Sequence, residues 1–170
     1  MTKPDGIIEI FLQPGEYYFG DRSTRIRTLL GSCVSMVFWH PKALLGGMCH
    51  FLLPSRKRPI LALDGRYGDE ALELVLREIK ATKTRPEDYR IGIFGGGDMF
   101  PQIAGKSQIG QQNVEAAKRL IKAHGLICHG AHAGGVGHRN LILDVWSGRI
   151  ALKHPPHIGS DTPLPGDRRP

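Results

Sequence analysis

A cysteine with the chemistry of a nucleophile follows a short turn-forming stretch. In residues 28–34, TLLGSCV, Cys33 comes directly after Gly31-Ser32 and stands at the start of an apolar segment. Glycine and serine favour tight turns. A thiolate attacks acyl carbons, and a neighbouring charge can lower the thiol pKa from about 8.5. Cys33 is therefore a candidate nucleophile, and the alternative is a small buried hydrophobic side chain, as most free cysteines are.

His50 is the expected partner of Cys33. Two segments rich in apolar, β-branched and aromatic residues, 26–39 and 45–53, predict the arms of a β-hairpin. If the hairpin turns on Pro41-Lys42, opposed residues have numbers that sum to 83, so Cys33 faces His50. Opposed Cβ atoms lie roughly 4.5–5.5 Å apart, which lets an imidazole accept the thiol proton. A slip of one residue would set Cys49 opposite Cys33 and send His50 to the other face.

A zinc site is the main alternative for the cysteines and histidines. The candidate ligands are Cys33, Cys49, His50, Cys128, His129, His132 and His138. The spacing argues against such a site, because no Cys-x-x-Cys motif occurs and the adjacent pairs Cys49-His50 and Cys128-His129 would point to opposite faces of a strand. We expect both of these cysteines to fill the core and the histidines of segment 129–138 to lie in exposed loops.

Two glycine-rich stretches suggest nucleotide binding at first sight. They are Gly95-Gly96-Gly97-Asp98 and Gly134-Gly135-Val136-Gly137, and neither fits a dinucleotide fingerprint. The triplet Gly105-Lys106-Ser107 ends like a phosphate loop, but Phe100 occupies the position of the required glycine. We expect these glycines to permit tight turns near a site, where N–H groups could face a developing oxyanion, with ordinary strand-to-loop turns as the alternative.

The remaining sequence predicts the elements that must position these residues. Apolar residues at helical spacing predict a helix over 69–83, capped by Asp69, and another over 111–124, stopped by Gly125. Strands are expected at 7–12, 26–39, 45–53, 90–94, 126–128, 141–146 and 149–152. Ser147-Gly148 is expected to form a two-residue hairpin turn. This order indicates an α/β or α+β domain with mixed sheets covered by two helices.

Length and composition predict a single folded domain. The chain has 170 residues, of which 41% are hydrophobic and 23% charged, a balance too apolar for a disordered chain. We place the domain at 1–154. The tail 155–170 carries prolines at 155, 156, 163, 165 and 170 and is expected to have no fixed structure.

Charge and cysteine content limit the location and the partners. The net charge of +7 would attract an acidic protein surface, nucleic acid or an anionic membrane. The basic stretch 54–59 contains no aromatic residue for stacking on bases, so we expect a solvated loop and no nucleic-acid site. Three cysteines cannot all pair and no charged-then-apolar leader opens the chain, which favours the cytoplasm. The longest weakly charged stretch, 28–39, is shorter than the ~20 residues of a membrane span, so the chain is not expected to cross a membrane.

Several short motifs occur in colinear order between residues 7 and 153. The most specific combination is Leu-Gly-Ser-Cys at 30–33 with Gly-Gly-Met-x-His-x-x-Leu-Pro at 46–54. Further motifs lie at 14–16, 65–67, 94–100, 109–110, 113–116, 134–135, 138–139 and 144–148. On these motifs the chain resembles the chemoreceptor glutamine deamidases of the CheD family.

The resemblance implies a protein-glutamine glutaminase. Such an enzyme converts selected glutamines of methyl-accepting chemotaxis receptors to glutamate and releases ammonia, without metal or cofactor. The resemblance assigns the nucleophile to Cys33, the catalytic histidine to His50 and the third catalytic position to Thr28, although the family threonine lies one position earlier, where Arg27 stands here. Backbone N–H groups at Gly31 and Ser32 are expected to support the oxyanion, with Ser32 otherwise a turn former.

The resemblance also implies a fold and a regulator. The expected fold is a single α+β domain built as an α/β/β layered sandwich, and the expected regulator is a phosphatase of the CheC type. The family often carries an acidic pair before Gly134, where this chain has Ala131-His132. These departures keep a second hypothesis open, a non-catalytic chemotaxis adaptor that binds receptor or phosphatase. A zinc-binding module is the third hypothesis.

Overall fold

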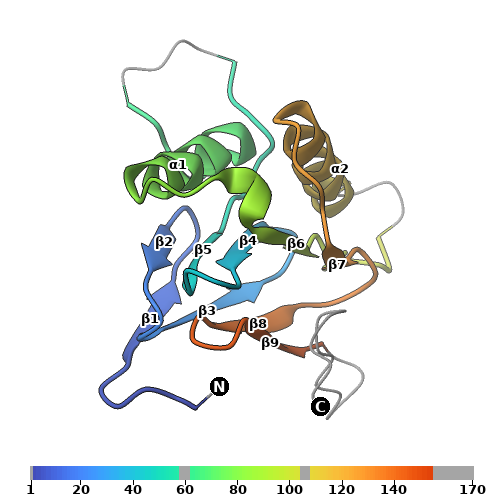
Figure 1. The fold of residues 1–170 in the computed structure, drawn as a ribbon. Coiled ribbons are helices and arrows are strands. Elements are labelled where there is room, and N and C mark those ends of the chain that lie inside the picture. Colours follow the sequence, from blue (N-terminus) through green and yellow to red (C-terminus); the bar gives the residue numbers. More distant parts are fainter. Residues whose placement is uncertain (1, 58–61, 104–107, 155–170) are drawn as a thin grey trace.

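Two β-sheets and two helices form three stacked layers. The computed structural model describes residues 2–57, 62–103 and 108–154. Both helices cover the outer face of a five-stranded sheet, and a four-stranded sheet packs against its inner face (Figure 1). This arrangement confirms the expected single-domain α+β fold with mixed sheets and two covering helices.

Both sheets are mixed, because each contains one parallel pair of strands. The five-stranded sheet has the order β2 (Tyr17–Gly20), β5 (Leu45–Cys49), β4 (Val34–His40), β6 (Arg90–Gly95) and β7 (Gly130–Ala133). The four-stranded sheet has the order β1 (Ile8–Leu12), β3 (Thr24–Leu30), β8 (Arg139–Asp144) and β9 (Arg149–Lys153). The parallel pairs are β6 with β7 and β1 with β3.

The helices confirm the predicted apolar spacing. Helix α1 spans Gly68–Ala81 and α2 spans Ile109–Ala123, with a short 3-10 helix at Pro86–Asp88. Asp69 is not the N-cap of α1, because Tyr67 occupies that position without a side-chain cap. Asp69 instead lies in the first turn, where its charge suits the helix dipole. Gly125 has the positive φ of 70° that ends α2 as predicted.

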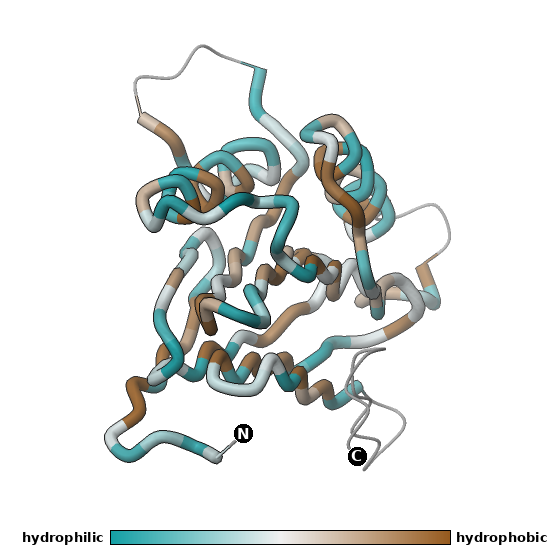
Figure 2. The backbone as a smooth tube through the Cα atoms, viewed as in Figure 1, coloured by the Kyte–Doolittle hydropathy of each residue, from teal (hydrophilic) through white to brown (hydrophobic). Residues whose placement is uncertain are grey.

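Two hydrophobic clusters hold the layers together. One lies between the helices and the five-stranded sheet, and the other lies between the two sheets. Brown and teal alternate along the strands of the four-stranded sheet, which lies at the bottom of Figure 2, because one face of this sheet is buried and the other faces solvent. The central strands β5, β4 and β6 of the five-stranded sheet differ, since nearly all of their residues are buried, as expected for strands covered on both faces.

The predicted strand 26–39 is in fact two strands that belong to different sheets. Strand β3 ends at Leu30 in the four-stranded sheet, and β4 begins at Val34 in the five-stranded sheet. The three residues between them, which include Cys33, carry the chain from one sheet to the other (Figure 1). The sequence does not mark this break. The crossing residues are small, and β4 lacks the alternation of polar and apolar residues that would distinguish it as a separate strand.

The hairpin between β4 and β5 has a longer turn than predicted. Trp39 pairs with Gly46, and His40 pairs with Leu45, so opposed residue numbers sum to 85 and four residues form the turn. The ring Nδ1 of His40 accepts the backbone N–H groups of Lys42 and Ala43 at 3.2 and 2.9 Å. These bonds stabilise the longer turn in place of a two-residue turn on Pro41-Lys42.

Three other expectations about local structure need correction. Strand β2 lies in a segment for which no strand was expected, and residues 126–128 form no strand, since β7 begins only at Gly130. The turn between β8 and β9 has four residues, because Asp144 pairs with Arg149. The tail 155–170 lies outside the described residues. Among the described residues, no helix has the length and apolar character needed to cross a bilayer.

Candidate active site

A hydrogen bond between the two sheets joins Thr28 to His50. Thr28 lies on β3 of the four-stranded sheet, and His50 follows β5 of the other sheet. The Thr28 Oγ1 atom lies 2.7 Å from Nδ1 of His50 and also donates to the carbonyl oxygen of Leu12 at 2.9 Å. Both side chains are buried. Arg27 is exposed and pairs with Glu9, so it faces away from this contact.

The two bonds of the Thr28 hydroxyl determine the tautomer of His50. A carbonyl oxygen accepts but never donates, so the single hydroxyl proton of Thr28 is directed at Leu12. The hydroxyl oxygen must then accept a proton from Nδ1 of His50. A neutral His50 therefore carries its proton on Nδ1, which leaves Nε2 with a free lone pair.

The backbone of His50 is anchored on the side away from β4. Its N–H donates to Glu16 at 3.1 Å, and its carbonyl accepts the N–H of Gly15 at 2.8 Å. On the β4 side, Val34 and Phe51 exchange two backbone hydrogen bonds, of 3.1 and 2.9 Å. The backbone around His50 is thus held on both sides, and its ring reaches Thr28 of the other sheet.

The strand register places Cys33 diagonally to His50. The Val34–Phe51 bridge continues the register of the hairpin, so His50 stands opposite Ser35 and Cys33 stands opposite Leu52. The expected direct pairing of Cys33 with His50 is therefore wrong by two residues. An even shift keeps both side chains on one face of the sheet. Cys33 accordingly packs against the cluster between the sheets, and no hydrogen bond joins it to His50.

Burial keeps both groups uncharged at neutral pH. Burial raises the pKa of the Cys33 thiol above its ordinary value. It lowers the pKa of His50 to about 4. The resting pair is a thiol and a neutral imidazole, in contrast to the expected thiolate with a depressed pKa.

All three carbonyl groups of the turn 31–33 are held by neighbouring elements. The carbonyl of Gly31 accepts the N–H of Gly97 at 2.9 Å, and that of Cys33 accepts the N–H of Gly96 at 2.8 Å. The carbonyl of Ser32 accepts a bond from the Asn113 side chain at 3.1 Å. By contrast, the N–H groups of Ser32 and Cys33 donate to no residue within the described part of the chain. Free N–H groups beside a nucleophile can bind an oxyanion.

The first glycine-rich stretch is adapted to this turn. Gly95 has a φ of 106°, and a Cβ atom there would overlap the carbonyl oxygen of Cys33. Gly134, in the second stretch, donates its N–H to the carbonyl of Gly95 at 2.9 Å. The two stretches therefore pack together behind the turn that carries Cys33, and Gly95 allows the close approach of the two backbones.

The other candidate ligands have different surroundings. Cys49 is buried in the core as predicted, but Cys128 is exposed and its thiol donates to the carbonyl of Gly130 at 3.1 Å. His132 is half-buried on β7 instead of in a loop, and its Nδ1 accepts a bond from buried Arg139 at 2.9 Å. In the ranges that the structure describes, no three side chains of His, Cys, Asp or Glu gather in a group that could hold a metal ion.

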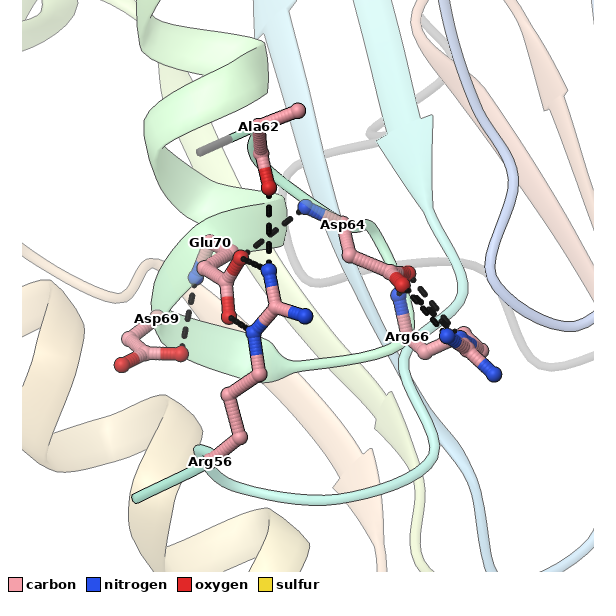
Figure 3. A network of polar contacts seen from close by, with 6 residues as sticks. All are labelled: Arg56, Ala62, Asp64, Arg66, Asp69 and Glu70. Atoms are coloured by element: carbon pink, nitrogen blue, oxygen red, sulfur yellow. Dashed lines mark hydrogen bonds and ion pairs between the residues drawn. The ribbon is translucent and has the colours of Figure 1, made fainter. Parts of the chain in front are cut away.

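A partly buried ion pair holds the segment that follows His50. The Arg56 guanidinium donates twice to Glu70 of α1, at 3.0 and 2.8 Å, and once to the carbonyl of Ala62 at 2.9 Å (Figure 3). Glu70 also accepts the N–H of Asp64 at 3.0 Å. Within the stretch expected to be a solvated loop, Arg56 is therefore an anchor, while residues 58–59 lie outside the described part.

Two groups that shape the site received no role from the sequence alone, although Asn113 begins the motif at 113–116. The Leu12 carbonyl belongs to the backbone and carries no residue-specific signal. Asn113 has a faint signal, because it lies among the buried apolar residues of α2, where a polar side chain needs a reason.

The family model and the named relatives agree on one family. The family model CheD, described as CheD chemotactic sensory transduction, matches residues 52–154. A probable chemoreceptor glutamine deamidase CheD of Pseudomonas syringae pv. tomato is 50% identical over 159 residues, which cover 92% of this chain and 95% of that protein. The corresponding CheD 3 of Dechloromonas aromatica is 48% identical, with coverage of 89% and 91%.

More distant matches extend the comparison. A probable chemoreceptor glutamine deamidase CheD 1 of Leptospira interrogans is 36% identical over 92% of this chain and 99% of that protein. The crystal structure of the hypothetical protein YfiH of Bacillus licheniformis matches 80% of this chain and 60% of its own, with 14% identity and a TM-score of 0.45. With half of its residues shared with a relative over nearly its whole length, this chain belongs to the CheD family.

Proposed function

We propose that this chain is a chemoreceptor glutamine deamidase, which hydrolyses glutamine side chains of methyl-accepting chemotaxis receptors to glutamate and ammonia. Membership of the CheD family and the names of its relatives support this substrate. The observation that carries the chemistry is the 2.7 Å contact of Thr28 with His50, because it leaves Nε2 unprotonated on the sheet face that also bears Cys33. Cys33, His50 and Thr28 are the proposed catalytic residues.

The first half of the reaction forms a thioester. Nε2 of His50 accepts the proton of the Cys33 thiol as the sulfur attacks the carboxamide carbon of the substrate. The electron pair of the C=O bond moves to its oxygen, and the free N–H groups of Ser32 and Cys33 bind that oxyanion. The imidazolium then protonates the amide nitrogen. The C–N bond breaks, ammonia leaves, and the acyl group remains on sulfur.

The second half hydrolyses the thioester with the same groups. Nε2 of His50 takes a proton from water as the oxygen attacks the acyl carbon. The C–S bond then breaks, the proton returns to sulfur, and glutamate is released. In both halves Thr28 keeps the Nδ1 proton in place, so that only Nε2 accepts and donates protons.

The uncharged resting pair fits this general-base mechanism. With a pKa of about 4, His50 is unprotonated throughout the neutral range, so its Nε2 lone pair is free to accept a proton. The absence of a Cys33–His50 hydrogen bond means that substrate binding must bring the two groups together, which is common for catalytic contacts in unliganded enzymes.

The proposed setting is the cytoplasm, where the signalling bundles of chemoreceptors would present the glutamines. A net charge of +7 favours encounter with an acidic receptor surface, at a rate that falls with salt. A phosphatase of the CheC type is the proposed regulator.

A non-catalytic adaptor is the second candidate function. The raised pKa of the Cys33 thiol favours it, since an inert thiol would suit a protein that only binds its receptor. The adaptor would bind receptor without changing the mass of any glutamine.

Mass spectrometry of a co-expressed receptor separates the two functions. Wild-type chain should raise the mass of particular receptor glutamines by about one dalton, because an amide becomes an acid. Cys33→Ala and His50→Ala should abolish the change, whereas Cys128→Ala, which removes an exposed thiol, should not. Full conversion by the Cys33 variant would reject the mechanism, and no conversion by a folded wild-type chain would favour the adaptor.

A further inference from the structure

Asn113 connects the turn that carries Cys33 to the segment that follows His50. Its side chain is completely buried on α2. Its amide nitrogen Nδ2 donates to the carbonyl of Ser32 at 3.1 Å and to the carbonyl of Leu52 at 2.8 Å. In the strand register Leu52 stands opposite Cys33. A single side chain therefore ties the Cys33 turn to the segment after His50.

This contact replaces a missing rung of the β-ladder. The last backbone bonds between the two strands join Val34 to Phe51. The next rung would join Ser32 to Leu53, but the N–H of Leu53 donates to Arg66 instead, at 3.1 Å. Two carbonyl oxygens that both lack a backbone donor remain facing the helix. An asparagine side chain supplies two N–H bonds from one nitrogen, so it can hold both oxygens at once.

The rigid peptide group transmits this contact to the Cys33 N–H. In a planar trans peptide the C=O of one residue and the N–H of the next point in opposite directions. Holding the Ser32 carbonyl against Asn113 therefore directs the Cys33 N–H away from α2. The bond from Gly97 to the Gly31 carbonyl directs the Ser32 N–H in the same manner. Both N–H groups are free of internal partners among the described residues.

We propose that Asn113 is a positioning residue for the oxyanion donor of Cys33. It acts through the Ser32–Cys33 peptide and touches neither the sulfur nor the substrate. The inference rests on the proposed deamidase function, because an oxyanion forms only if Cys33 attacks an acyl carbon. It adds a specific role for α2, which otherwise only covers the sheet.

The unpaired oxygen of Asn113 supports a role beyond packing. Its Oδ1 atom is buried without a hydrogen-bond partner in the described structure, and such an atom costs roughly 1–3 kcal/mol. An apolar side chain would avoid this cost and pack equally well against the sheet. The two bonds from Nδ2 are the feature that only the amide provides.

Replacing Asn113 should slow the chemistry without removing the reactive thiol. Asn113→Asp keeps the volume but puts an oxygen against the two carbonyls, and Asn113→Ala removes the contact if the first variant fails to fold. We expect kcat for ammonia release from a receptor fragment to fall about 10- to 100-fold, with KM changed by less than about threefold. Alkylation of Cys33 by iodoacetamide should change by less than about threefold, because that displacement forms no oxyanion.

Ile121→Ala is the matched control. Ile121 is buried on α2 and touches neither carbonyl, so the variant loosens the helix packing alone. At equal loss of thermal stability it should keep kcat within about threefold of wild type. The proposal is overturned if an Asn113 variant retains wild-type kcat, if kcat and alkylation fall in parallel, or if Ile121→Ala loses as much activity. An active Cys33→Ala enzyme would instead reject the proposed mechanism itself.

Discussion

Thr28 and His50 come from different sheets, and their 2.7 Å contact is one of the polar bonds that join the two layers. Hydroxyl chemistry makes the contact directional, because the Thr28 proton is already committed to the Leu12 carbonyl. The same pair of bonds orients the ring and selects its tautomer. A structural contact between layers thus becomes a determinant of which imidazole nitrogen can act as a base.

Removing the Thr28 hydroxyl should impair the base more than the fold. Thr28→Val preserves shape but leaves Nδ1–H of His50 without an acceptor, so the ring can rotate and exchange tautomers. We expect kcat to fall about 100-fold and the free energy of unfolding by about 1–2 kcal/mol. Thr28→Ser, which keeps the hydroxyl, should retain most of the activity. Steady-state kinetics and nitrogen NMR of the imidazole check both points, and equal activity of the two variants would contradict the role.

Stability should decline in mild acid because of His50. Its pKa is about 4 when folded and about 6.5 in a model peptide, so the unfolded chain binds the proton more tightly. Above pH 6.5 the imidazole is neutral in both the folded and the unfolded chain, so its burial costs nothing there. As the pH falls toward 4 the unfolded chain takes up the proton first, and the free energy of unfolding falls by roughly 2–3 kcal/mol. Urea unfolding of wild type and His50→Gln at pH 7 and pH 4.5 measures how much of the pH dependence of stability comes from His50. If the two proteins lose stability equally, the imidazole is not desolvated as the structure indicates.

The free enzyme should have a sluggish Cys33 thiol. Burial raises its pKa, so iodoacetamide labelling should continue to accelerate above pH 9 instead of levelling off near neutrality. Peptide mass spectrometry separates Cys33 from the exposed Cys128, which serves as an internal reference in the same sample. A plateau of Cys33 labelling below pH 8 would show a preformed ion pair with His50, and catalysis would then begin from the thiolate.

Gly95, which packs behind the proposed nucleophile Cys33, should tolerate no side chain. A Cβ atom at Gly95 would overlap the Cys33 carbonyl oxygen, and the φ of 106° is strained for any other residue. Gly95→Ala should cost at least about 2 kcal/mol of stability and displace the Cys33 turn, with loss of activity. Gly125→Ala is the control, since Gly125 also has positive φ but open space around it, so about 1 kcal/mol is expected. Thermal unfolding and ammonia release test both variants, and an active Gly95 variant would refute the packing argument.

The anchor of the segment after His50 should be worth more than a surface ion pair. Glu70 is buried and accepts three bonds, so Glu70→Ala removes both ion-pair bonds of Arg56 and leaves the Asp64 N–H without its acceptor. We expect a loss of about 2–3 kcal/mol in unfolding free energy. Glu87→Ala breaks the exposed pair with Arg85 and should cost less than about 0.5 kcal/mol. Similar melting temperatures for the two variants would show that the buried network adds nothing to stability.

Local patterns in the sequence were sufficient for the helices and the fold class. The apolar stripe of Leu72, Val75 and Ile79 repeats with the period of a helix, and Gly125 ends the second helix through its own conformational freedom. The strand periodicity and the order of elements likewise indicated mixed sheets under two helices. Such features depend on neighbours within a few residues, which is why the sequence alone determined them. The nucleophile candidate Cys33 was also visible locally, as a cysteine after a turn-forming pair.

Only the tertiary structure decided how the site is assembled. The register of His50 depends on a four-residue turn stabilised by a His40 ring, and the break at residues 31–33 depends on which sheet each strand joins. The neutral resting pair follows from burial, since desolvation shifts the thiol and imidazole pKa values in opposite directions. Contacts such as Leu12 with Thr28, or Asn113 with Ser32, join residues far apart in the chain. No local pattern encodes them, because they exist only after two sheets and a helix have packed together.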